Sequence, residues 1–170
     1  MNTRKHPRLK GYDYSRNGAY FVTFCTKERR HLLSRIVVGP DALIGPQLEL
    51  SPHGKLVDES IQSAVLAYPN VEIPCYVIMP NHVHLMVVIE PNGPMGASGP
   101  TLGMVIRGIK TKVTRAIGHS IWQDKFYDHI IRNGEDYLRT CHYIDSNPAK
   151  WQEDEYYDGK SSMPITTKES

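Results

Sequence analysis

One apolar hairpin constrains the fold of this chain more than any other feature. Two stretches rich in β-branched and other apolar residues, 71–79 and 82–90, are separated only by Pro80-Asn81. Stretches of this composition predict buried strands, and so short a connection predicts that the two strands pair antiparallel. The chain is therefore expected to contain a sheet with this hairpin in it.

The second strand of this hairpin carries two histidines, His82 and His84, on either side of one valine. Successive side chains of a strand point to opposite faces, so the two imidazoles are expected to share one face of the sheet. Buried imidazoles without a common task are costly to satisfy, whereas two of them side by side are suited to hold one divalent metal ion. The pair is thus predicted to be part of a metal site.

Further patterns complete the order of elements. The stretches 19–26 and 121–127 predict two more strands, and 32–50, which Gly-Pro pairs interrupt, predicts an irregular hairpin. Apolar residues at helical spacing predict three helices, which begin after Ser51, after Thr101 and at Gly134; the last is expected to end at Asp145. Without the irregular hairpin and the last helix the order is βαββαβ, the split βαβ of an α+β, ferredoxin-like antiparallel sheet. The third helix is the candidate to cover the other face.

Length and composition predict one domain over residues 1–170, of which 40% are hydrophobic and 22% charged. Its expected irregular parts are a basic arm at 1–16, a flexible loop at 91–100 and a polar tail at 152–170. No apolar run reaches the roughly 20 residues of a membrane span, so no membrane partner is expected. Three widely spaced cysteines without a CxxC pair predict a reducing, cytoplasmic location, with no disulfide framework and no cysteine zinc site.

The distribution of basic residues suggests a nucleic-acid partner more than the net charge of +2 does. Clusters of this kind suit a phosphate backbone, although solvated basic faces explain each cluster taken alone about equally well. His129 and Arg132 are weaker candidates for DNA contact, and packing is the alternative for His129. The basic candidates are Arg4, Lys5, Arg8 and Lys10 in the arm, and Arg107, Lys110, Lys112 and Arg115 on the second helix.

The third helix carries Tyr143 and Asn147, which lie four residues apart and so on one helical face. If that face packs over the two histidines, Asn147 adds a side-chain oxygen to the metal site. The phenol of Tyr143 then lies near a metal-bound phosphate, which it is able to attack as a nucleophile. Alternatives remain open, because Tyr143 also suits a packing position and Asn147 also suits a helix C-cap before Pro148.

Several segments in the same order resemble the HUH single-tyrosine transposases of small insertion sequences, and among them the REP-associated tyrosine transposases. The resemblance covers roughly residues 4–151, and the order and spacing of the segments make it specific. The matching segments are Lys10-Gly11-Tyr12-Asp13-Tyr14, Gly18-Ala19-Tyr20-Phe21, Met79-Pro80-Asn81-His82-Val83-His84, Ile121-Trp122-Gln123, Tyr127-Asp128-His129-Ile130-Ile131-Arg132 and Tyr143-Ile144-Asp145-Ser146-Asn147-Pro148-Ala149-Lys150-Trp151.

The resemblance implies an enzyme that cleaves and rejoins single-stranded DNA beside a hairpin. Tyr143 is expected to form a 5′-phosphotyrosine link and to leave a free 3′ hydroxyl. The implied cofactor is Mg²⁺ or Mn²⁺, held by His82, His84 and Asn147. Some members of this family act as homodimers and others as monomers, so a homodimer is one expected state.

Two other functions are considered. A histidine-triad nucleotide hydrolase also places histidines at alternate strand positions, but Met86 stands where a third alternating histidine is expected. The second alternative is a ferredoxin-like nucleic-acid-binding module without cleavage activity, which keeps the fold and lacks the chemistry.

Overall fold

The computed structural model describes residues 18–38, 45–90 and 100–153. The predicted basic arm at 1–16 and most of the predicted loop and polar tail lie outside the described residues. The strands are β1 (Gly18–Thr26), β2 (Ser34–Val37), β3 (Gln47–Leu50), β4 (Val71–Glu72), β5 (Tyr76–Ile78), β6 (His82–Ile89) and β7 (Trp122–Ile131). The helices are η1 (Lys27–Arg29), α1 (Pro52–Ala67), α2 (Leu102–Ile117), α3 (Gly134–Ser146) and η2 (Asn147–Glu153).

The main sheet has the strand order β4-β6-β1-β7, with β5 also paired to β6. All these pairs are antiparallel. Counting β4 and β5 together as the second strand, this is the order of a ferredoxin-like split βαβ sheet, so the predicted α+β fold is confirmed. The central strands are β1 and β6, which places His82 and His84 in the middle of the sheet.

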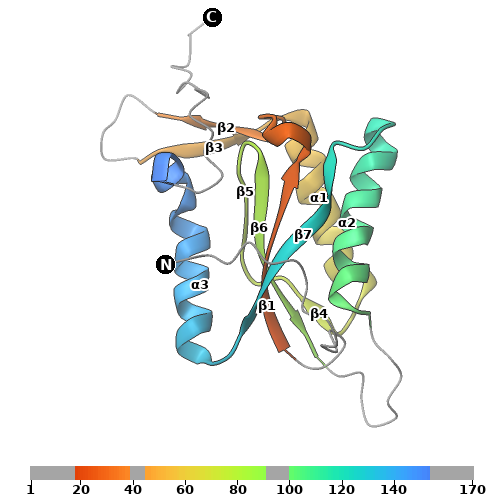
Figure 1. Cartoon of the computed structure of the whole chain (residues 1–170), viewed down its shortest axis with the longest axis vertical. Coiled ribbons are helices and arrows are strands. Elements are labelled where there is room, and N and C mark those ends of the chain that lie inside the picture. Colours follow the sequence, from red (N-terminus) through yellow and green to blue (C-terminus); the bar gives the residue numbers. More distant parts are fainter. Residues whose placement is uncertain (1–17, 39–44, 91–99, 154–170) are drawn as a thin grey trace, which may run out of the picture.

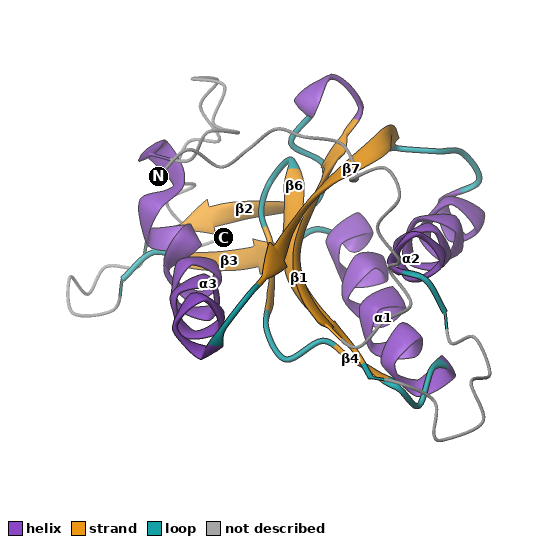
Figure 2. Cartoon of the chain, turned by 60° about the horizontal axis from the view of Figure 1, so that its bottom comes forward, coloured by secondary structure: helices purple, strands orange, loops and turns teal. Residues whose placement is uncertain are grey.

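Helices α1 and α2 cover one face of the sheet, and α3 lies against the other (Figure 1). Figure 2 shows the same three layers from another side, with the strands between the two helical layers. Both predicted N-caps are present, because the hydroxyls of Ser51 and Thr101 accept hydrogen bonds from backbone N–H groups in the first turns of α1 and α2. Helix α2 ends at Gly118, whose φ of 99° favours glycine.

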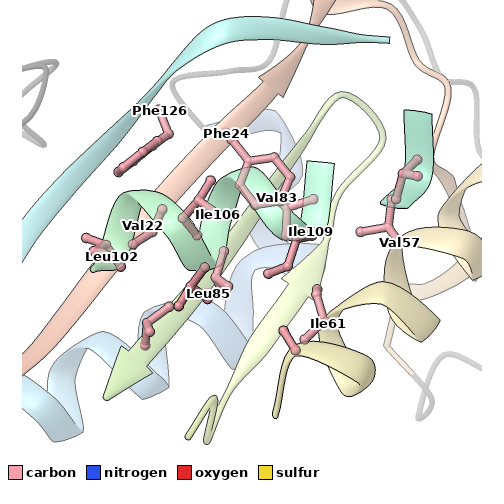
Figure 3. Packing of buried hydrophobic residues seen from close by; sticks show 14 of the residues in the cluster. Val22, Phe24, Val57, Ile61, Val83, Leu85, Leu102, Ile106, Ile109 and Phe126 are labelled. Atoms are coloured by element: carbon pink, nitrogen blue, oxygen red, sulfur yellow. The ribbon is translucent and has the colours of Figure 1, made fainter. Parts of the chain in front are cut away.

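The larger hydrophobic cluster lies between the sheet and the helices α1 and α2 (Figure 3). Alternate residues of β6, among them Val83 and Leu85, point into it and meet Ile61 and Ile109 from the two helices. The residues between them therefore point toward α3, where a second cluster includes Phe21, Met79, Met86, Ile144 and Trp151.

Two predicted strands have different bounds in the structure. The expected strand 71–79 is divided into β4 and β5, because Pro74 has no N–H to donate to the ladder and the pairing stops around it. The expected strand 121–127 continues to Ile131, since β7 pairs with β1 as far as Ala19. The longer β7 delivers the chain directly to the start of α3.

The predicted irregular hairpin is present as β2 and β3, which form a separate two-stranded sheet. It is attached to the main sheet by a hydrogen bond of 2.8 Å from the Ser34 hydroxyl to the carbonyl of Ile78. Among the described residues, no helix combines the length and the apolar character that crossing a bilayer requires.

Candidate active site

The two histidines lie on the α3 face of β6 and are fully covered. His82 is 0% and His84 1% exposed, although the surrounding cluster is apolar. Their Nε2 atoms are 3.0 Å apart, and the ring planes are inclined by 69°. The prediction that the two imidazoles face the same way is confirmed.

The spacing of the two Nε2 atoms suits ligands of one ion. Two atoms at neighbouring corners of an octahedral ion, each about 2.1 Å from it, lie about 3.0 Å apart. The other nitrogen of each ring has a buried partner: Nδ1 of His82 is 2.7 Å from Oδ1 of Asn81, and Nδ1 of His84 is 2.7 Å from Oγ1 of Thr23. Such outer partners fix the orientation of metal-binding histidines.

These partners restrict where the ring protons are. The side-chain carbonyl oxygen of Asn81 only accepts, so Nδ1 of His82 donates and its Nε2 keeps a lone pair. The Thr23 hydroxyl both donates and accepts, so His84 is able to adopt either tautomer. Neither partner was predicted from the sequence. Thr23 lies opposite His84 in the ladder between β1 and β6, a register that no local pattern specifies.

Helix α3 packs over the histidines of its own chain. It begins after Asn133, whose side chain caps the N–H of Asp136 at 2.8 Å. The Tyr143 ring lies 5.5 Å from the ring of His84 and meets the ring of Phe21 edge-on, at 5.8 Å. The structure therefore brings Tyr143 beside His84 within one chain.

Asn147 occupies the position between the two contacts that the chain makes with the histidines. Four residues before it Tyr143 contacts His84, and four residues after it the Trp151 ring stacks on His82, with centroids 5.9 Å apart and planes inclined by 26°. Asn147 is 2% exposed, and among the described residues its Oδ1 is a buried atom without a hydrogen-bond partner. It also holds the C-cap position of α3, so the two roles considered for it are compatible.

The donor set fits a divalent cation. Within the described segments, no group of three or more His, Cys, Asp or Glu residues is able to hold a metal, so a third protein ligand has to be of another type. The unpartnered amide oxygen of Asn147 is of that type and, with two imidazole nitrogens, gives a mixed nitrogen and oxygen set. Imidazole suits Mn²⁺ better than Mg²⁺, which prefers oxygen ligands throughout.

No protein-family model matches the chain. An uncharacterized protein of Haemophilus influenzae is 30% identical over 92% of this chain and 94% of its own length. A REP-associated tyrosine transposase of Escherichia coli K12 is 38% identical over 80 residues, which are 46% of this chain and 45% of that protein. The solved structure of a REP-associated tyrosine transposase bound to a REP hairpin superposes with a TM-score of 0.59 at 25% identity, covering 89% of this chain and 74% of that one. The chain belongs to the REP-associated tyrosine transposase family.

The basic residues predicted on the second helix lie away from the site of this transposase-family chain. Helix α2 covers the face of the sheet opposite α3, so its side chains do not meet the histidines (Figure 2). Their contact with DNA stays a prediction, and it would involve a different face of the molecule. Two of the four, Arg107 and Arg115, are exposed.

The other two make contacts within the fold. The Lys110 ammonium donates to the carbonyls of Gln123 at 2.9 Å and of Lys125 at 3.3 Å. Burial lowers its pKa to about 8. The Lys112 ammonium donates to the hydroxyl of Ser63 at 2.6 Å. Lys110 thus points at β7, which the helical pattern of the sequence did not indicate.

His129 and Arg132 lie near the start of α3. The His129 ring is 3.2 Å from the carboxylate of Asp136, and the same carboxylate accepts the backbone N–H of Arg132 at 3.3 Å. These contacts hold the turn between β7 and α3. Direct DNA contact by either side chain stays a prediction.

Proposed function

We propose that this chain cleaves and rejoins single-stranded DNA beside hairpin structures, with Tyr143 as the nucleophile and a divalent metal ion as cofactor. One observation carries the proposal: two buried imidazoles converge at 3.0 Å directly beneath the helix that places Tyr143 against one of them. Membership of a transposase family that includes a protein bound to a REP hairpin supports the same substrate.

In the proposed site, His82, His84 and Asn147 hold Mn²⁺ or Mg²⁺. The ion, when bound, polarises a backbone phosphate and offsets the negative charge that develops on it. Trp151 and Phe21 pack around the imidazole and phenol rings and exclude water from this side of the sheet. The apolar surroundings strengthen each electrostatic interaction in the site.

Tyr143 forms the new bond. Its phenolic oxygen attacks the phosphorus and loses its proton to water, and the bond from phosphorus to the 3′ oxygen breaks with its electron pair. The 3′ oxygen takes up a proton and leaves as a hydroxyl, while the 5′ phosphate stays on Tyr143. Because the phosphotyrosine link retains the energy of the broken bond, a 3′ hydroxyl is able to reverse the step without another energy source.

The test is covalent capture on DNA. The full chain is incubated with a hairpin-bearing single strand and Mn²⁺, and denaturing gels are examined for a protein–DNA adduct. Tyr143→Phe is expected to abolish the adduct, whereas Tyr137→Phe on the same helix is the matched control and should retain it. An adduct that survives Tyr143→Phe would contradict the assignment. Hairpin binding without any adduct, unaffected by His82→Ala, would favour a binding module without cleavage.

A mixing experiment tests whether one chain supplies the whole site. All four proposed residues meet within one chain, which supports action in cis. A mixture of His84→Ala and Tyr143→Phe proteins is therefore expected to form no adduct. Restoration of the adduct in the mixture would show that a second subunit supplies the tyrosine, as in a homodimer with exchanged helices.

A further inference from the structure

Two cysteines join the tyrosine-bearing helix to the sheet. Cys141 lies on α3, two residues before Tyr143, and Cys75 lies in the segment between β4 and β5. Their sulfur atoms are 2.6 Å apart, although 66 residues separate them in sequence. Both residues are free cysteines of intermediate exposure, so a small oxidant is able to reach them. No backbone movement is needed to bring the sulfurs to the roughly 2.05 Å of a disulfide bond.

The surroundings hold both thiols in place. The carbonyl of Cys75 accepts the backbone N–H of Met86 at 2.9 Å, which attaches this segment to β6 beyond the short strand β5. Cys141 packs with Tyr137 and Ile144 in the hydrophobic cluster under α3. Burial raises the pKa of the Cys75 thiol, and the adjacent Cys141 adds to the effect. The reduced pair is therefore a stable thiol pair at neutral pH.

We propose that Cys75 and Cys141 are a reversible redox-modification site, which a disulfide oxidant of the glutathione class converts into an intramolecular disulfide that fixes α3 on the sheet. In a reducing compartment such a bond is transient and reports on oxidation. The formation of the bond is independent of the proposed function. Its consequence for Tyr143, which it holds beside His84, rests on that function.

The reaction proceeds by two thiol–disulfide exchanges. One cysteine loses its proton, and its thiolate attacks a sulfur of oxidised glutathione and releases one glutathione thiolate. The second cysteine, also as the thiolate, then attacks the protein sulfur of the mixed disulfide and releases the second glutathione. Two protein thiols are oxidised, one glutathione disulfide is reduced to two thiols, and an excess of thiol reverses both steps.

The test uses the full chain treated with oxidised glutathione at mildly alkaline pH, then with or without dithiothreitol. Mass spectrometry is expected to show the loss of two hydrogens and a peptide linked through Cys75 and Cys141. The disulfide closes a long loop of the unfolded chain, so the Tm should rise by about 5–10 °C and return on reduction. These readouts need no DNA, so a failure of the cleavage proposal would not affect them.

Three variants sharpen the result. Cys75→Ser and Cys141→Ser should each lose the linked peptide and the rise in Tm. Cys25→Ser is the matched control, because Cys25 is a buried cysteine of β1 outside the pair, and it should behave as the unmodified protein does. Glutathione adducts as the only products, a linked peptide containing Cys25, or a disulfide that leaves the Tm unchanged would overturn the proposal.

Discussion

Replacing Thr23 by valine removes the hydroxyl that supports His84 while keeping the shape of the side chain. Thr23 is 3% exposed, and its Oγ1 lies 2.7 Å from Nδ1 of His84. Valine has nearly the same volume and suits a strand, so β1 should keep its pairing with β6. The substitution therefore tests one hydrogen bond in the proposed metal site.

The expected effect has two parts. Loss of an outer partner of a metal-binding histidine typically reduces metal affinity about 10- to 100-fold, which corresponds to about 1.4–2.7 kcal/mol. The metal-free protein should also lose stability, by about 1–3 kcal/mol, because Nδ1 of His84 stays buried without a partner. Both effects point in the same direction, so the Thr23→Val protein should bind Mn²⁺ weakly and unfold earlier.

The assay is a calorimetric titration of Mn²⁺ into the unmodified protein and into the Thr23→Val and Thr23→Ser proteins. Serine keeps the hydroxyl and loses only a methyl group, so it should retain most of the affinity. Chemical unfolding of the same proteins without metal gives the second quantity. Equal Mn²⁺ affinity of all three proteins would refute the role of Thr23, and so would a serine variant as weak as the valine variant.

Three further predictions follow from particular contacts. Gly54→Ala should lower the free energy of unfolding by about 2 kcal/mol or more, since its Cβ would lie 1.9 Å from the carbonyl oxygen of Leu33, whereas Gly108→Ala, with open space around it, should raise it by about 0.5–1 kcal/mol in urea unfolding. Asn147→Ala should reduce Mn²⁺ affinity at least about 10-fold but change metal-free stability by under about 1 kcal/mol, because its Oδ1 has no hydrogen bond among the described residues to lose; equal losses in both would refute the ligand role. Lys110 has a pKa lowered to about 8, so above that pH the unfolded chain binds more protons and the unmodified protein should gain about 1 kcal/mol relative to Lys110→Met from about pH 7 to about pH 9; a constant difference would contradict this.

Local rules were sufficient for the elements and for the orientation of the histidines. The period of two along a strand placed His82 and His84 on one face, and capping residues marked where α1 and α2 begin. The order of elements then restricted the sheet to a small number of topologies, of which the ferredoxin-like order is the one observed.

Features that depend on register or on a distant partner were beyond these rules. Thr23 supports His84 only because β1 and β6 pair in one particular register, and a shift of one residue would turn the hydroxyl to the other face. The Lys110 ammonium points at β7 because burial of a neighbouring part of the helix leaves backbone carbonyls within its reach. Neither partner is near in sequence, so neither contact leaves a periodic pattern.

The hydrogen bonds around the two imidazoles explain how a buried polar pair is tolerated with and without a metal ion. Without metal, the Thr23 hydroxyl donates to Nδ1 of His84, and the Nε2–H of His84 donates across 3.0 Å to the lone pair of His82. With metal, the proton of His84 resides on Nδ1 and is donated to Thr23, so both Nε2 atoms present lone pairs to the ion. Every polar atom of the two rings has a partner in either state, because a hydroxyl both donates and accepts. A valine at this position satisfies neither arrangement, whereas a serine satisfies both, which is why these two substitutions separate the metal site from a merely packed pair of histidines.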